Sequence, residues 1–257
     1  TKSCRGNVLV ATQSTERMAW ETYAIYCMRP LRQDQIEGFL RLCYRLLPED
    51  VPMSRAEYVL VCDAYLQQVL DTTMSEEETT LRDQVLTNPM NLTLVALLCA
   101  YRKSPDMKHL AEQCYQLIAM AYQRQHEEQS FPLTQFSERI YRMRLNDEGI
   151  IPYQRFEKEI DCMVKYALIL SRTSFDIYGT PVTEWYFRHE TIADFFILQA
   201  FLEGNSHRID RHLGDSRFKG VYALLDAAGI VDTEELQTLS YSVHPTESSV
   251  YPVSRTT

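Results

Sequence analysis

Glycine is scarce in this chain of 257 residues, which contains only 8. All-β sandwiches and barrels depend on glycine for their many tight turns, so this scarcity argues against them and favours helices. Long apolar runs are also missing, because the longest one, 92–101, is too short to cross a bilayer. No signal-peptide pattern opens the sequence. We therefore predict a cytoplasmic protein that does not attach to membranes.

Positive charge is in deficit as well. The 26 lysines and arginines are outnumbered by 35 acidic residues, which gives a formal net charge of −9. An acidic protein repels the phosphate backbone of nucleic acids, which disfavours nucleic-acid binding. The seven cysteines form no C-x-x-C pair, which indicates a reducing compartment without a disulfide framework. His207 and His212 are five residues apart and do not share a helical face, so no metal site is predicted.

The common catalytic motifs are absent too. A P-loop requires G-x-x-x-x-G-K-[ST], whose backbone N–H groups surround phosphates, and none of the glycines begins one. The G-x-S-x-G and H-E-x-x-H motifs are likewise missing. We assign no catalytic residues to this chain.

Helical signals dominate the residues after 30. Ser54-x-x-Glu57 and Ser75-x-x-Glu78 are capping-box patterns, and Ser104-Pro105 reads as an N-cap followed by proline at the first helical position. The run Val59–Asp63 resembles a strand ending in an aspartate, but the capping box before it places the run in a helix. Apolar periodicity and these caps predict helices over 33–47, 54–70, 75–86, 90–101, 104–126, 134–145 and 153–166.

The pattern changes after Gly149. Residues 167–177 and 182–187 read as two strands joined by the turn at 179–181, and a helix with apolar residues from Ile192 to Leu198 follows. Helix, hairpin and helix in this order are the outline of a winged helix. Residues 7–12 read as one buried strand whose pairing partners must come from elsewhere, and 240–257 are predicted to be disordered.

Three residues are candidates for ligand contact. Gln13 follows the strand 7–12, and ligands of open α/β sheets bind at the carboxyl ends of strands. Pro89 begins an apolar helix and offers a flat surface to a purine. His189 lies where the second hairpin strand meets the next helix, a position suited to a phosphate oxygen. Taken alone, each also has a plain structural explanation as a strand end, a helix start or a capping or core histidine.

Five short motifs in a fixed order resemble the C-terminal half of a NACHT-type nucleotide-binding module of the STAND class, which includes NLR-like receptors and bacterial relatives. The resembling segments are 7–14, 28–40, 88–94, 187–196 and 212–222. The resemblance implies four regions: a remnant of an α/β nucleotide-binding domain (1–30), a helical domain (31–148), a winged-helix-like domain (149–230) and a tail (231–257). The fold class it implies is therefore mainly α, with one strand from a truncated α/β domain.

The resemblance also implies a function. Pro89 would pack on adenine and His189 would contact the β-phosphate of ADP, which holds the closed, inactive state. Exchange of ADP for ATP, bound with Mg²⁺ in the parent protein, would release the winged helix, permit self-association and so transmit a signal. The P-loop half of the same protein would be the partner of this chain. The parent is then expected to be a slow ATPase, and the chain alone to be inactive and to hold no nucleotide tightly.

One departure concerns Gln13, which occupies the sensor position where the family usually carries arginine. A neutral amide cannot pair with a γ-phosphate as a cation does. This departure favours a first alternative, a helical protein-interaction module that does not depend on nucleotide. The second alternative is a winged-helix DNA-binding domain. The charge around the hairpin is balanced, as Arg172, Glu184, Arg188 and Glu190 show, and this argues against DNA binding.

Overall fold

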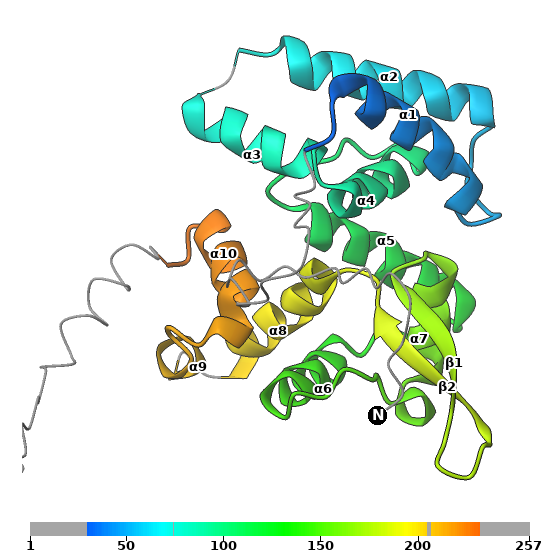
Figure 1. The fold of residues 1–257 in the computed structure, drawn as a ribbon, viewed down its shortest axis with the longest axis vertical. Coiled ribbons are helices and arrows are strands. Elements are labelled where there is room, and N and C mark those ends of the chain that lie inside the picture. The colour runs from blue at the N-terminus through cyan, green and yellow to red at the C-terminus, as the bar shows by residue number, and fades with distance from the viewer. Residues whose placement is uncertain (1–29, 74, 205–206, 232–257) are drawn as a thin grey trace, which may run out of the picture. The chain divides into compact units, whose positions relative to one another are not determined.

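A computed structural model describes residues 30–73, 75–204 and 207–231 (Figure 1). These residues form ten α-helices, three short 3₁₀ helices and a single two-stranded antiparallel sheet, which confirms a mainly helical fold. All of the described elements lie between Gln33 and Ala227. Gln13, the predicted strand 7–12 and the predicted disordered segment 240–257 lie outside the described residues.

The elements follow one another in the order shown in Figure 1. The helices are α1 (Gln33–Cys43), α2 (Arg55–Asp71), α3 (Glu76–Leu86), α4 (Pro89–Ala100), α5 (Leu110–Gln125), α6 (Leu133–Leu145), α7 (Glu157–Lys165), α8 (Glu190–Gly204), α9 (His207–Arg211) and α10 (Lys219–Ala227). The 3₁₀ helices are η1 (Tyr44–Leu46), η2 (Tyr153–Arg155) and η3 (Ser216–Phe218), and the strands are β1 (Ile169–Phe175) and β2 (Pro181–Phe187).

Both predicted capping boxes are present. Ser54 Oγ accepts the N–H of Glu57 at 3.3 Å, and Glu57 Oε2 accepts the N–H of Ser54 at 2.8 Å. Ser75 and Glu78 repeat the exchange at 3.2 and 2.9 Å. These bonds satisfy N–H groups that have no partner inside the helix, so they fix the starts of α2 and α3. The run 59–63 lies inside α2, as predicted.

The prediction that a helix begins at Ser104-Pro105 is wrong, since α5 begins at Leu110. Side chains hold the intervening residues in a turn instead. Gln113 Nε2 donates to the carbonyl of Ser104 at 3.0 Å, and Gln113 Oε1 accepts the N–H of Asp106 at 2.8 Å. The carboxylate of Asp106 accepts the N–H of Lys108 at 2.9 Å. These bonds occupy the polar groups that a longer helix would have used.

Helix α4 is the centre of the first group of helices. It packs against α1, α2, α3 and α5, and its residues from Leu94 to Ala100 are all buried. Helices α1 and α2 are also joined by Tyr58, whose hydroxyl donates to the carbonyl of Leu40 at 2.8 Å. A helix that is apolar on every side, as α4 is, must be enclosed by others.

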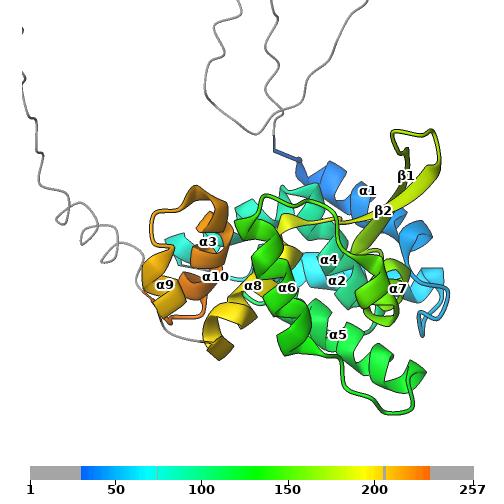
Figure 2. The same cartoon turned by 90° about the horizontal axis from the view of Figure 1, so that it is seen from below.

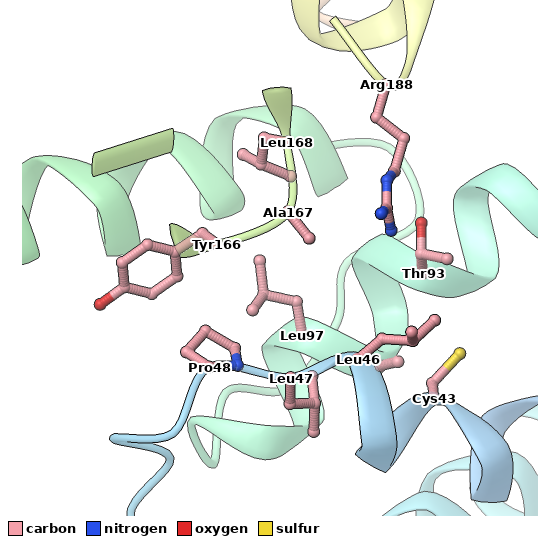
Figure 3. A pocket seen from close by; sticks show the side chains of 11 residues that line it. Cys43, Leu46, Leu47, Pro48, Thr93, Leu97, Tyr166, Ala167, Leu168 and Arg188 are labelled. Carbon is pink, nitrogen blue, oxygen red and sulfur yellow. The ribbon is translucent and has the colours of Figure 1, made fainter. Parts of the chain in front are cut away.

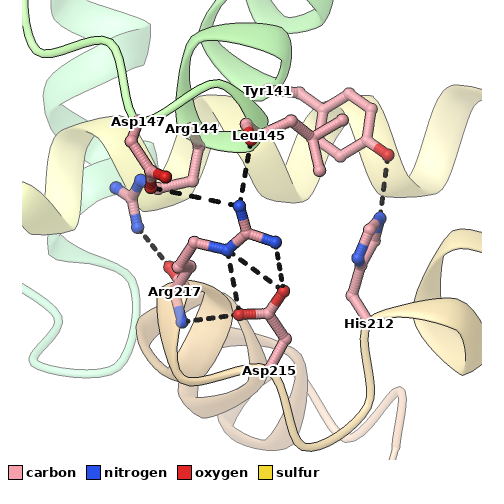
Figure 4. A network of polar contacts seen from close by, with 7 residues as sticks. All are labelled: Tyr141, Arg144, Leu145, Asp147, His212, Asp215 and Arg217. Atoms are coloured by element: carbon pink, nitrogen blue, oxygen red, sulfur yellow. Dashed lines mark hydrogen bonds and ion pairs between the residues drawn. The ribbon is translucent and has the colours of Figure 1, made fainter.

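A second group forms around α8, which packs against α6 and α10. Figure 4 shows the polar contacts that hold the segment before α10 against the end of α6. Arg217 donates to the carbonyl of Leu145 at 3.0 Å and pairs with Asp215 at 2.8 Å, while the Tyr141 hydroxyl lies 2.8 Å from His212 Nε2. Helix α6 falls within the predicted helical domain (31–148), yet it packs on α8 of the predicted winged-helix-like domain (149–230).

The hairpin has the predicted strand, turn and strand, and it projects beyond the helices in Figures 1 and 2. Its register pairs Ile169 with Phe187 at the base and Phe175 with Pro181 at the tip. At the base, Trp185 stacks on Tyr153 with ring centroids 4.2 Å apart. Within the described residues, no helix is long and apolar enough to cross a membrane.

Candidate functional site

Two of the three candidate ligand-contacting residues lie near each other. Pro89 is the first residue of α4, where Asn88 caps the helix by accepting the N–H of Met90 at 2.9 Å. His189 connects the end of β2 to the start of α8. Gln13 lies outside the described residues.

Thr93 joins these two segments. Its Oγ1 lies 2.7 Å from Nε2 of His189, although the two residues are 96 positions apart in the chain. Thr93 follows Pro89 by four residues, so both lie on one face of α4. That face of α4 and the junction between β2 and α8 therefore form a single candidate site.

The proton count at this contact leaves one imidazole nitrogen unsatisfied. Thr93 Oγ1 lies 2.7 Å from the carbonyl of Met90 and 2.7 Å from Nε2 of His189, and its single proton can go to only one of them. When Thr93 donates to Met90, it accepts from His189. His189 Nε2 then carries the proton and Nδ1 is a bare acceptor. Nδ1 is buried and has no hydrogen-bond partner among the described residues. In the other tautomer Thr93 donates to Nε2, and Nδ1–H becomes a buried donor that points at no acceptor.

The environment keeps His189 neutral. Only 3% of its surface is exposed. Burial, and then the neighbouring positive charge of Arg188, lowers the pKa of His189 to about 4. The ring is therefore uncharged at neutral pH, and an anion near Nδ1 would raise its pKa again.

Arg188 lies beside a small cavity enclosed by η1, α4 and the residues before β1. In Figure 3 its side chain points toward Thr93, while Leu97, Ala167 and Leu168 form apolar walls. The guanidinium of Arg188 makes no ion pair within the described residues. The backbone N–H of Arg188 donates to the carbonyl of Leu168 at 2.8 Å. The cavity volume is about 20 Å³, which is room for one water molecule.

The wall of the cavity also contains a cysteine, Cys43. Burial, and then the nearby Cys62, raises the pKa of the Cys43 thiol in the cavity wall to about 11, so this thiol is protonated and unreactive at neutral pH. No cluster of three or more His, Cys, Asp and Glu side chains suits a metal ion in the part of the chain that the structure describes. The arrangement of Thr93, Arg188 and His189 suits the binding of an anion by a cation and an imidazole.

Sequence reasoning missed Thr93 and Arg188. Arg188 directly precedes the candidate histidine, and its position at a strand end next to a helix start is a signal that could have been used. Thr93 has no such signal, because its role comes from a tertiary contact with a distant segment.

Comparison with protein-family models, with curated proteins and with solved structures found no match to this chain.

Proposed function

We propose that this chain is the regulatory helical and winged-helix part of a nucleotide-switched signalling NTPase of NACHT type, and that it contacts ADP through Pro89, Arg188 and His189. The observation that carries the proposal is the hydrogen bond between Thr93 and His189. Through it, the helix start expected to face adenine and the histidine expected to face phosphate share one site.

The polar groups of the site fit a phosphate. Nδ1 of His189 is a buried atom without a partner among the described residues, and a phosphate oxygen would accept its proton in the tautomer where Thr93 donates to Nε2. Arg188 supplies a guanidinium, whose N–H groups match phosphate oxygens. Since α8 begins directly after His189, the positive end of its helix dipole adds to the same attraction.

The cavity beside Arg188 is too small for a nucleotide. We therefore place adenine on the partly exposed side of Pro89, and only the phosphate against His189. The helix, hairpin and helix from α7 to α8 would act as the winged helix that closes over the nucleotide. The P-loop half of the same protein would supply the remaining contacts and Mg²⁺, and nucleotide exchange would control self-association.

Calorimetric titration of ADP tests the proposal. We expect ADP to bind the parent protein that includes the P-loop half, to bind its His189→Ala variant at least about tenfold more weakly, and not to bind residues 1–257 alone. A His109→Ala variant is the control, since that histidine side chain is 42% exposed and belongs to the turn before α5. Equal affinities for the parent and its His189→Ala variant would refute the assigned role.

The second candidate function is a helical interaction module that does not respond to nucleotide. The hairpin tip favours it, because Ile177 and Tyr178 are 90% and 86% exposed on an ordered turn. A parent protein that binds no nucleotide at all would make this the better account. The third alternative, DNA binding by the winged helix, has little support because Arg172 faces Glu184 across the hairpin.

A further inference from the structure

A groove beside α6 has three arginines among its six lining residues. Its volume is about 240 Å³, and it is bounded by Thr134, Gln135, Glu138, Arg139, Arg142 and Arg155. Five of these residues follow one face of α6, and Arg155 approaches from η2. The groove shares no residue with the site around His189.

Positive charge exceeds negative charge around this groove. Glu138 is held by two arginines, with Arg142 Nε at 3.0 Å and Arg208 at 2.8 Å. Arg139 pairs with Glu148 at 2.7 Å. The groove and its ion-pair partners therefore contain four arginines (Arg139, Arg142, Arg155 and Arg208) and two carboxylates (Glu138 and Glu148). The excess is two positive charges.

Arg155 contributes most directly to this excess. Its guanidinium lies 5.5 Å from the centroid of the Phe156 ring, and it makes no ion pair within the described residues. Arg142 remains accessible, with 64% of its side chain exposed. Both can therefore turn toward a ligand without losing a buried contact.

The start of α6 adds to the attraction for anions. Thr134 and Gln135 lie in the first turn of this helix of 13 residues, and Pro132 provides no side-chain cap. The N–H groups of a first turn have no partner inside the helix and carry the positive end of its dipole. A concentration of positive charge is unexpected in a protein with a formal net charge of −9.

We propose that the groove beside α6 binds a phosphoryl group, with Arg142 and Arg155 as its main ligands. A guanidinium presents two parallel N–H groups that match two phosphate oxygens. A phosphoryl group carries a charge of roughly −1.5 to −2 at neutral pH, which balances the excess of the groove. A single carboxylate would leave half of that excess in place.

Titration monitored by NMR of the arginine Nε–Hε signals tests this assignment on residues 1–257. Inorganic phosphate and O-phosphoserine are the two probes, and they distinguish a free phosphate from a phosphorylated side chain. Sodium chloride at matched ionic strength shows the effect of screening alone. We expect both Arg142 and Arg155 signals to shift with the phosphate probes and to stay in place with chloride.

Two variants complete the test. Arg142→Gln and Arg155→Gln should each weaken phosphate binding about fivefold or more, while thermal unfolding stays unchanged because both side chains are exposed. The control is Arg102→Gln, whose arginine is 58% exposed and pairs with Glu57 elsewhere on the surface. Unchanged affinity in both groove variants, or equal loss in the control, would overturn the proposal. Neither outcome bears on ADP binding at His189.

Discussion

At the scale of single residues, His189 couples folding to pH. Its pKa is about 4 in the folded chain and near 6.5 for an unperturbed histidine. Between these values the unfolded chain binds more protons, so the free energy of unfolding rises with pH across this window and is lost as the pH falls. Asp194 acts in the opposite direction, because burial raises its pKa to about 6 and its contribution falls as the pH rises.

We predict that His189→Gln flattens the acid side of the stability profile. A buried neutral histidine with these two pKa values loses about 1.6 kcal/mol of stability between pH 6.5 and pH 5, and glutamine loses none. Urea unfolding of the wild type and the variant at both pH values measures the two slopes. The contribution of Asp194 to the slope cancels in this comparison, because both proteins contain Asp194. Equal slopes would mean that His189 is not held neutral.

Gly220 allows a second test at this scale. A Cβ built on it would lie 2.0 Å from Oδ2 of Asp194 and 2.7 Å from its Cγ, and Asp194 is itself buried against Arg144 at 3.2 Å. We predict that Gly220→Ala destabilises the protein by at least about 2 kcal/mol in urea unfolding. Gly38→Ala is the matched control, since nothing lies within 4 Å of its added Cβ. In that helix, alanine should stabilise by about 0.5–1 kcal/mol.

At the scale of elements, the hairpin turn is held by one aspartate. Oδ1 of Asp176 accepts the N–H groups of Tyr178 at 2.9 Å and Thr180 at 2.8 Å, and Gly179 adopts a φ of 79°. We predict that Asp176→Ala speeds amide hydrogen exchange at Tyr178 and Thr180 by about tenfold, while the amides of α8 keep their protection. Unchanged exchange at the tip would mean that the strands alone order this turn.

Elements were predictable where the signal was local. The capping boxes at Ser54 and Ser75 fixed the starts of α2 and α3, because a cap involves residues only three positions apart. The same reasoning failed at Ser104, where Gln113 reaches back nine residues and holds the segment in a turn. The hydrogen bond from Gln113 to Ser104 competes with the helix cap, and a pattern of residues three positions apart cannot reveal it.

At the scale of the molecule, the candidate site was predictable only in part. Pro89 and His189 stood out from their own surroundings in the sequence, but their connection through Thr93 depends on how α4 meets the start of α8. The groove beside α6 was also predictable only in part. The stripe along α6 is visible in the sequence, whereas the approach of Arg155 and the pairing of Glu138 with Arg208 arise from tertiary packing.

Packing across the boundary predicted at 148/149 bears on how the chain unfolds. The buried core is one continuous cluster that extends from Ile36 to Leu225. Tyr115 of α5 lies 5.2 Å from the ring of Phe195 in α8, and Lys165 at the end of α7 pairs with Asp50 at 2.6 Å. The two sides of the boundary therefore share one core, whereas domains that unfold independently have separate cores.

We accordingly predict that residues 31–231 unfold in one cooperative transition. Differential scanning calorimetry should give a single peak, with equal calorimetric and van 't Hoff enthalpies. Hydrogen exchange should report similar protection in α4 and α8, because opening either helix exposes the apolar surface of the other group. Two separate peaks, or exchange in α8 while α4 stays protected, would instead establish two domains. Closure of the winged helix over a nucleotide, as proposed, is a movement of packed elements and does not require the segment from α7 to α8 to unfold independently.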